Sequence, residues 1–347
     1  MGLPMIANET LAKVRVPLLD TDPILAILYI CVLCVALFIG TVGNTLTLIV
    51  SAVAKNVNKV GKEFIVNLAL ADICVSSFAD PMCILGVVKG QAWFDDKIWF
   101  CELISSVCLT ACFCAFLSLS LVSTNRYIYV CHNSVYYTLF KRKICIVLCV
   151  ISWIIAFFFQ FPNFIGWGDH GFDGKSHQCI WDRTANYSYT LFVSIALIGS
   201  PLFLMSISYV LIFCHIYETK VNVYSLNTDD PDRLKKTWTQ TLQSSRTLFV
   251  LFLVFVFCWT PYTTVIAMDV KDSLPMEVHL FVTLLAHLHS STSFLVYCIF
   301  NKSFRKAVAN ILCWSRSSTS SDTMDTKSTE TSRTSGSAKK PVEVTDS

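Results

Sequence analysis

The stretch LISSVCLTACFCAFLSLSLVSTNRY, residues 103–127, decides the fold. It contains no Asp, Glu, Lys or Arg before Arg126. An uncharged apolar segment of this length is sufficient for a helix to cross the roughly 30 Å hydrocarbon core of a bilayer. Arg126 stands at the end of the run, where an arginine reaches the aqueous boundary or is held inside a helical bundle, and not at the centre, where a charge costs roughly 2.5–3.5 kcal/mol or more. The pattern predicts a membrane span that ends on a functional arginine.

The composition indicates a membrane protein. The chain has 347 residues, of which 54% are hydrophobic and 15% charged, and its mean hydropathy is +0.57. These values are unlike those of a water-soluble protein. The net charge of +3 is too small to indicate a nucleic-acid partner. The 16 cysteines are scattered among apolar runs without metal-ligand spacing, so most are predicted to act as small apolar side chains.

Six further apolar runs are long enough to cross a membrane, which predicts seven spans in total. They cover residues 24–54, 64–88, 144–168, 184–217, 247–268 and 278–301. The first run is too long for a cleavable signal peptide and is expected to be a span itself. Prolines inside four of the runs are expected to kink them, namely Pro81, Pro162, Pro201 and Pro261.

The distribution of basic residues sets the orientation. With the N-terminus outside, only seven of the 27 lysines and arginines fall on the outer side. We therefore expect a multi-pass plasma-membrane protein with an extracellular segment at residues 1–23, a helical bundle at 24–301 and a cytoplasmic C-terminus. Residues 302–313 predict a short amphipathic helix in the membrane interface. Residues 314–347 are dominated by Ser, Thr and charge, which predicts a disordered tail.

Several covalent modifications are expected. Asn8 and Asn186 begin glycosylation sequons on the outer side. On the outer side of the membrane, only Cys101 and Cys179 fall in the loops or at the outer edge of the spans, and that side is oxidising, so we predict a disulfide between them. Cys313, at the end of the interfacial helix, is a candidate for palmitoylation. The tail hydroxyls are either phosphate acceptors or simply solubilising, and the sequence leaves both open.

Motifs recur once per span, in order. They are Asn44; Leu68-Ala69-Leu70-Ala71-Asp72; Asn125-Arg126-Tyr127; Trp153; Pro201 with Tyr209; Phe255 with Cys258-Trp259-Thr260-Pro261; and Tyr297. Together with the cysteine pair they resemble the rhodopsin-like (class A) G-protein-coupled receptors over about residues 24–313. The resemblance implies a seven-helix bundle that binds an extracellular ligand and activates a heterotrimeric G protein. It assigns coupling or activation to Asn125, Arg126, Tyr127, Tyr209, Tyr297, Phe255 and Pro261.

A finer resemblance points to the melatonin-receptor subgroup. It rests on residues 125–132, on Pro162-Asn163-Phe164 and on Tyr189-Thr190. The resemblance implies that Asn163 and Trp181 hold the ligand. Arg183 stands where the subgroup has a glutamine, so the ligand stays open between melatonin, another indole and a different molecule.

The sequence also departs from the class A pattern. Ser293-Phe294-Leu295-Val296-Tyr297 lacks the proline and asparagine of the seventh-helix motif, and Thr241 stands where the sixth helix often carries an acid. The expected consequences are no proline kink, no asparagine partner for Asp72 and a loosely held resting state.

Asp72 is a carboxylate in the middle of a span, which marks ion or proton handling by default. The resemblance implies a sodium site with Asn44, Ser290 and Ser293 as neighbours. Ala115 removes the usual hydroxyl from this site. A protonated Asp72 with a purely structural role is the alternative.

The outer half of the bundle holds the other candidate ligand residues. Cys108 stands where amine receptors carry an aspartate, and His287 where light-sensing opsins carry a lysine, so the chain resembles neither group. Asp80 and His287 are either ligand anchors or a satisfied polar pair, with Asp80 also able to serve backbone freed by Pro81. Trp259 forms a cluster with Phe255, Phe116 and Pro201. The resemblance implies that this cluster rearranges when a ligand binds, whereas the helical spacing alone indicates ordinary core packing.

Catalysis has no support, because the sequence lacks a Gly-rich phosphate loop, HExxH, GxSxG and paired catalytic carboxylates. The prediction is a receptor, not an enzyme, whose partners are a small extracellular ligand, a heterotrimeric G protein, membrane lipid and, through the tail, receptor kinase and arrestin. No cofactor other than sodium is expected. The alternatives are a class A receptor for a lipid or peptide and, below it, a transporter or ion carrier using Asp72, His287 and His289. Transporters usually show repeated halves, and this chain shows none.

Overall fold

The computed structural model describes residues 16–53, 61–225 and 231–321. For residues 220–225, 231–244 and 313–321 the description covers the backbone alone. The sequon at Asn8 and residues 322–347 of the tail lie outside the described residues. So do the side chains of Thr241 and Cys313.

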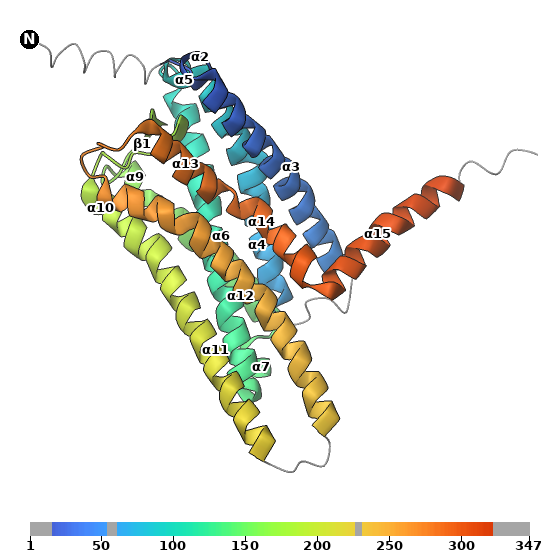
Figure 1. The fold of residues 1–347 in the computed structure, drawn as a ribbon. Coiled ribbons are helices and arrows are strands. Elements are labelled where there is room, and N and C mark those ends of the chain that lie inside the picture. Colours follow the sequence, from blue (N-terminus) through green and yellow to red (C-terminus); the bar gives the residue numbers. More distant parts are fainter. Residues whose placement is uncertain (1–15, 54–60, 226–230, 322–347) are drawn as a thin grey trace, which may run out of the picture. The chain divides into compact units, whose positions relative to one another are not determined.

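The fold is an all-helical membrane bundle, as predicted. Six helices or helix stacks are long and apolar enough to cross a membrane, and a bent pair makes the seventh span (Figure 1). In order the spans are α3 (Pro23–Val53); α4 (Lys62–Cys74), η1 (Val75–Ala79) and α5 (Asp80–Phe94); α6 (Ile98–Cys131); α8 (Arg142–Phe158) with α9 (Phe161–Phe164); α10 (Tyr187–Phe192), η2 (Val193–Gly199) and α11 (Ser200–Ser225); α12 (Pro231–Met268); and α13 (Met276–His287) with α14 (His289–Phe300). Short helices α2 (Leu18–Thr21) and α7 (Asn133–Leu139) lie outside the spans.

The span built around residues 103–127 is the centre of the bundle. In α6, 72% of the most apolar window is buried, compared with 22–50% in the other five single spans. Helices α4, α8, α11 and α12 all pack on α6. The apolar residues of α8 are largely exposed, as lipid-facing residues should be. Helix α6 therefore has buried residues at both ends of the bundle, with Cys108 at the outer cavity and Arg126 at the cytoplasmic end.

Two of the prolines follow wide helical turns. Pro81 comes after the π-helical segment η1, and Pro201 after η2. Proline has no N–H to donate and its ring clashes with the carbonyl four residues earlier, and a π turn relieves this clash with one extra residue. Pro261 lies inside α12, and Pro162 lies in the first turn of α9.

The seventh span bends without a proline. The axes of α13 and α14 differ by 44° across Leu288. Side-chain hydroxyls donate to backbone carbonyls there: Ser290 Oγ to the His287 carbonyl at 3.1 Å and Ser291 Oγ to the Leu288 carbonyl at 3.0 Å. Such side-chain bonds commonly bend helices. The expectation of no proline kink holds for residues 293–297, but the span is kinked one turn earlier.

A β-hairpin covers the outer end of the bundle. Strands β1 (His170–Asp173) and β2 (Gln178–Trp181) are antiparallel, with Phe172 opposite Cys179. The predicted Cys101–Cys179 disulfide is present and fixes β2 to the top of α6. The hairpin backbone also presses on α5, because a Cβ at Gly86 would lie 2.1 Å from the His177 carbonyl oxygen.

The helix after the bundle is longer than expected. Helix α15 runs from Lys302 to Ser321, where the sequence predicted an end at residue 313. Its first turns pack on the bundle through the buried Phe304, whose ring lies 5.6 Å from that of Tyr297.

Candidate functional site

A small cavity lies in the outer half of the bundle, beneath β2. Its volume is about 20 Å³, which suffices for about one water. Four of the predicted ligand residues line it: Cys108 from α6, Trp181 from β2, Trp259 from α12 and His287 from α13. The remaining lining is Leu109, Cys112, Phe113, Ile180, Val193, Ile198, Tyr262, Thr283 and Ala286. The walls therefore carry no carboxylate.

Trp181 is a buried part of the cavity wall. Only 1% of its surface is exposed. Its ring meets that of Tyr189 edge to face at 5.7 Å, and Tyr262 lines the same cavity. The neighbouring Ile180 is 8% exposed and enters the same space.

Asn163 supports the site from behind. It does not line the cavity. Its amide Nδ2 donates to the Tyr189 hydroxyl at 2.8 Å and to Gln160 Oε1 at 3.2 Å. Asn163 thus fixes the ring against which Trp181 packs, and its role as a direct ligand contact stays a prediction.

Asp80 and His287 form a buried pair. His287 Nδ1 lies 2.8 Å from Asp80 Oδ1. Asp80 itself does not line the cavity. The other ring nitrogen, His287 Nε2, lies 3.8 Å from the Cys83 sulfur. Cys83 in turn donates to Gln178 Oε1 of β2 at 2.8 Å. The two residues that the sequence left as separate candidates are therefore one unit, connected to the hairpin.

An aromatic column leads inward from the cavity. Trp259 meets Phe116 at 4.8 Å, and Phe116 meets Phe255 at 5.7 Å. His289 completes the column, with ring distances of 5.3 Å to Trp259 and 5.1 Å to Phe255. The aromatic members were predicted from the sequence, but His289 was named only as a candidate residue of a transporter.

Asp72 lies below this column and is fully buried. Neither of its carboxylate oxygens has a hydrogen-bond partner, and His289 Nε2 lies 3.7 Å from Oδ1. Asn44 Nδ2 donates to the Ser290 carbonyl at 2.8 Å, and Ser293 Oγ donates to the His289 carbonyl at 3.3 Å. Orphaned buried oxygens beside hydroxyl groups fit a small cation, so these residues would hold sodium. The site stays a prediction, and His289 is the neighbour that the sequence did not identify.

Arg126 is enclosed at the cytoplasmic end. It is 6% exposed. The phenols of Tyr209, Tyr297 and Tyr136 lie within electrostatic range of its guanidinium. Tyr136, from α7, also accepts from Asn125 Nδ2 at 3.3 Å. It was not recognised in the sequence, because it is one of two adjacent tyrosines between predicted spans and no motif marks it. Tyr127 points elsewhere, with its hydroxyl 3.1 Å from His132 Nε2.

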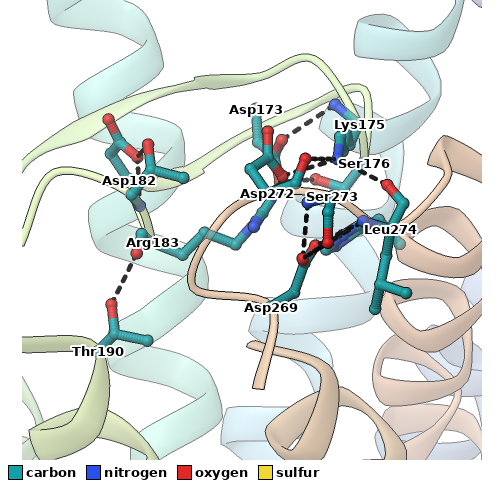
Figure 2. A network of polar contacts seen from close by, with 12 residues as sticks. Asp173, Lys175, Ser176, Asp182, Arg183, Thr190, Asp269, Asp272, Ser273 and Leu274 are labelled. Carbon is teal, nitrogen blue, oxygen red and sulfur yellow. Dashed lines mark hydrogen bonds and ion pairs between the residues drawn. The ribbon is translucent and has the colours of Figure 1, made fainter. Parts of the chain in front are cut away.

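Charged side chains clasp the outer loops together (Figure 2). Arg183, which follows β2, pairs with Asp272 and lies 3.6 Å from Asp173. Lys175 Nζ lies 2.9 Å from the same Asp272 carboxylate. Burial raises the pKa of Asp272, but hydrogen bonds from Arg183 and Lys175 outweigh it and hold the pKa below its usual range. The hairpin is thus tied to the loop between α12 and α13.

A second outer carboxylate is equally well satisfied. Burial raises the pKa of Asp269, but the hydrogen bond with His279 and those from the Ser273 and Leu274 amides lower it to about 2. The His279 contact is 2.9 Å long. Asp269, Asp272 and His279 bring ligand-type atoms within 4.8 Å of one another and could hold a divalent cation. In this structure Asp269 is bonded to His279, and Asp272 is paired with Arg183 and Lys175.

Asn186 is the predicted glycosylation site. Its Oδ1 accepts from the Ser188 amide and caps α10.

Comparison with known proteins identifies the family. Residues 43–298 match the family of seven-transmembrane receptors of the rhodopsin family. The chain belongs to this receptor family. It is 25% identical to melatonin receptor type 1C of Gallus gallus over 293 residues, covering 82% of each chain. It is 26% identical to human melatonin receptor type 1B over 288 residues, covering 81% of this chain and 77% of the relative.

The fold is shared with rhodopsin. The crystal structure of squid rhodopsin superposes with a TM-score of 0.71 over 88% of this chain and 93% of that one, at 15% identity. The resemblance to class A receptors and to the melatonin receptors is thereby confirmed, as are the multi-pass membrane character and the non-enzymatic class. A rhodopsin-family receptor transmits a signal between two sites. In this one the cavity under β2 and the enclosed Arg126 occupy the two ends of α6.

Proposed function

We propose that this receptor binds a small neutral aromatic molecule of the indole class from the extracellular side and activates a heterotrimeric G protein. The observation that carries the proposal is the column of Trp259, Phe116 and Phe255 below an aromatic cavity. A ligand acts on such a bundle by binding one arrangement better than another, and not by chemistry. The inner end of the same helix carries Arg126, which would become available to the G protein when α12 moves outward.

The lining supports this ligand class over others. The residues around the cavity offer aromatic faces and thiols but no carboxylate to pair with an amine. Flat rings pack well on aromatic walls, and the Thr283 hydroxyl and His287 imidazole supply polar contacts. The similarity to melatonin receptors favours the same class. Lipid and peptide ligands are the alternative.

The remaining assignments follow from the family and from charge. The distribution of Lys and Arg supports a plasma-membrane receptor with its N-terminus outside and its C-terminus in the cytosol. The Ser/Thr-rich tail provides acceptor sites for a receptor kinase, and phosphates there would recruit arrestin.

The test is a cell-based assay of cAMP and calcium with the receptor counted at the cell surface. Indoleamines, lipids and peptides are applied in turn, with Arg126→Ala as the uncoupled control. We expect an indole to change one of the two signals in a way that Arg126→Ala abolishes. Surface-expressed receptor that gives no signal with any ligand, or that carries radiolabelled ions across the membrane instead, would reject the proposal.

A further inference from the structure

The cavity is too small for the ligand class that its walls suit. Its free volume is about 20 Å³, whereas ligand pockets usually measure roughly 300–1,000 Å³. An aromatic molecule larger than water therefore has no room while β2 stays in place.

The occupant is an indole that belongs to the chain. The side chain of Trp181 is 3-methylindole attached to the backbone, and it is 1% exposed. It has contacts like those of a bound aromatic ligand: an edge-to-face contact with Tyr189, and a place beside Tyr262 and Trp259 at the same cavity. Ile180 closes the cavity beside it.

The segment that carries this side chain is held on both sides. Before it, Cys179 is bonded to Cys101 and Gln178 accepts from Cys83. After it, Arg183 pairs with Asp272 and Asp173. A tethered group has an effective concentration in the millimolar range or higher, so a weak side-chain contact suffices to keep the site occupied.

We propose that Trp181 is the resident ligand of this receptor. Its indole ring occupies the binding site, sustains signalling without any added molecule, and is displaced by an external ligand of the 3-substituted indole class. This inference rests on the proposed function, since it assigns the same site and the same ligand class. It changes the role of Trp181 from a wall of the pocket to its content.

The test is chemical rescue of a vacated site. Trp181→Ala in the full-length receptor should lower basal G-protein signalling about fivefold or more at equal surface expression, because a large-to-small change leaves a cavity. Added 3-methylindole should restore at least half of that signal, as apolar cavities bind free molecules of matching shape. Trp181→Phe should keep most of the basal signal. Trp99→Ala, which removes a tryptophan that is 68% exposed, is the matched control and should leave signalling unchanged with or without 3-methylindole.

Direct binding separates this inference from the proposed function. Tritiated 3-methylindole should bind saturably to Trp181→Ala and far more weakly to the wild type. Where the wild type has a measurable basal signal, an equal signal from Trp181→Ala would overturn the resident-ligand inference. So would a loss of signal in Trp181→Ala with neither rescue by 3-methylindole nor saturable binding of it. Saturable binding to Trp181→Ala without signalling from any variant supports the site and rejects the G-protein function instead.

Discussion

Asp80 on α5 and His287 on α13 are joined by a hydrogen bond of 2.8 Å, although 207 residues separate them in sequence. Asp80 is 0% exposed and His287 5%. A polar pair in this position connects the second span to the seventh directly below the hairpin. Each partner satisfies a group that would otherwise be buried alone, so the pair acts as one structural unit.

Removing one partner should cost more than removing both. His287→Ala leaves a buried carboxylate unpaired, which costs about 3–5 kcal/mol of unfolding free energy. Adding Asp80→Asn to His287→Ala removes the stranded charge and should recover part of this loss. The measurement is the melting temperature of the purified receptor in detergent, with the exposed Asp95→Ala as control. A double variant as unstable as His287→Ala alone would show that the pair is not a unit.

The Arg183–Asp272 clasp should hold the hairpin over the cavity. Asp272→Asn leaves Arg183 with Asp173 only, and we expect looser seating of Trp181 and a fall in basal signalling of about twofold to threefold. Because 40% of the Asp272 side chain is exposed, solvent screening limits the coupling to about 1 kcal/mol. A double-mutant cycle with Arg183→Gln measures this coupling, and Asp96→Asn, exposed in the preceding outer loop, is the control. Additive effects of the two changes would contradict the clasp.

Much of the architecture could be predicted because it depends on local features. A run of apolar residues must cross the membrane whatever its partners are, and the basic residues at its ends give the direction. The Cys101–Cys179 disulfide followed from the same reasoning, since only those two cysteines lay at the oxidising side. Arg126 was recognised because a charge at the end of an apolar run is conspicuous.

The internal geometry could not be predicted because it depends on helix rotation and on the path of a loop. A carboxylate in a span must have a partner, but the sequence does not say that Asp80 faces His287, or that His289 faces Asp72. Trp181 was identified as a ligand residue, yet whether it lines or fills the site depends on how deeply β2 enters the bundle. The bend at Leu288 had no proline to mark it.

Acid should weaken the seating of the hairpin through His177. Burial lowers the pKa of His177 to about 4, and nearby Asp173 offsets this only in part. In the unfolded chain a histidine has a pKa of about 6.5. As pH falls from about 7 to 4, the unfolded chain therefore takes up a proton that the folded receptor does not, and stability decreases. Asp269, with a pKa of about 2, stays charged in the folded receptor over this range, but in the unfolded chain it begins to take up a proton below about pH 5, so it adds to the loss of stability at the acid end.

The melting temperature between about pH 7.5 and 4.5 tests this expectation. His177→Gln should flatten the curve, and His132→Gln, at the cytoplasmic end, should not. Burial also lowers the pKa of His170. A residual slope should therefore remain in His177→Gln and shrink in the double variant His170→Gln/His177→Gln. A wild-type curve that is flat over this range would contradict the assignment.

Sodium should stabilise the receptor through Asp72. Both oxygens of this buried carboxylate lack a hydrogen-bond partner, and a cation that binds only the folded state adds about 1.4 kcal/mol at a concentration ten times its Kd. Raising NaCl against choline chloride at constant ionic strength should raise the melting temperature of the wild type. Asp72→Asn should abolish the effect, and Ser293→Ala should move its midpoint to higher concentration. If His289 supplies the compensating charge instead, sodium will have no effect on the melting temperature. His289→Gln will then lower the melting temperature of the wild type more than it lowers that of Asp72→Asn.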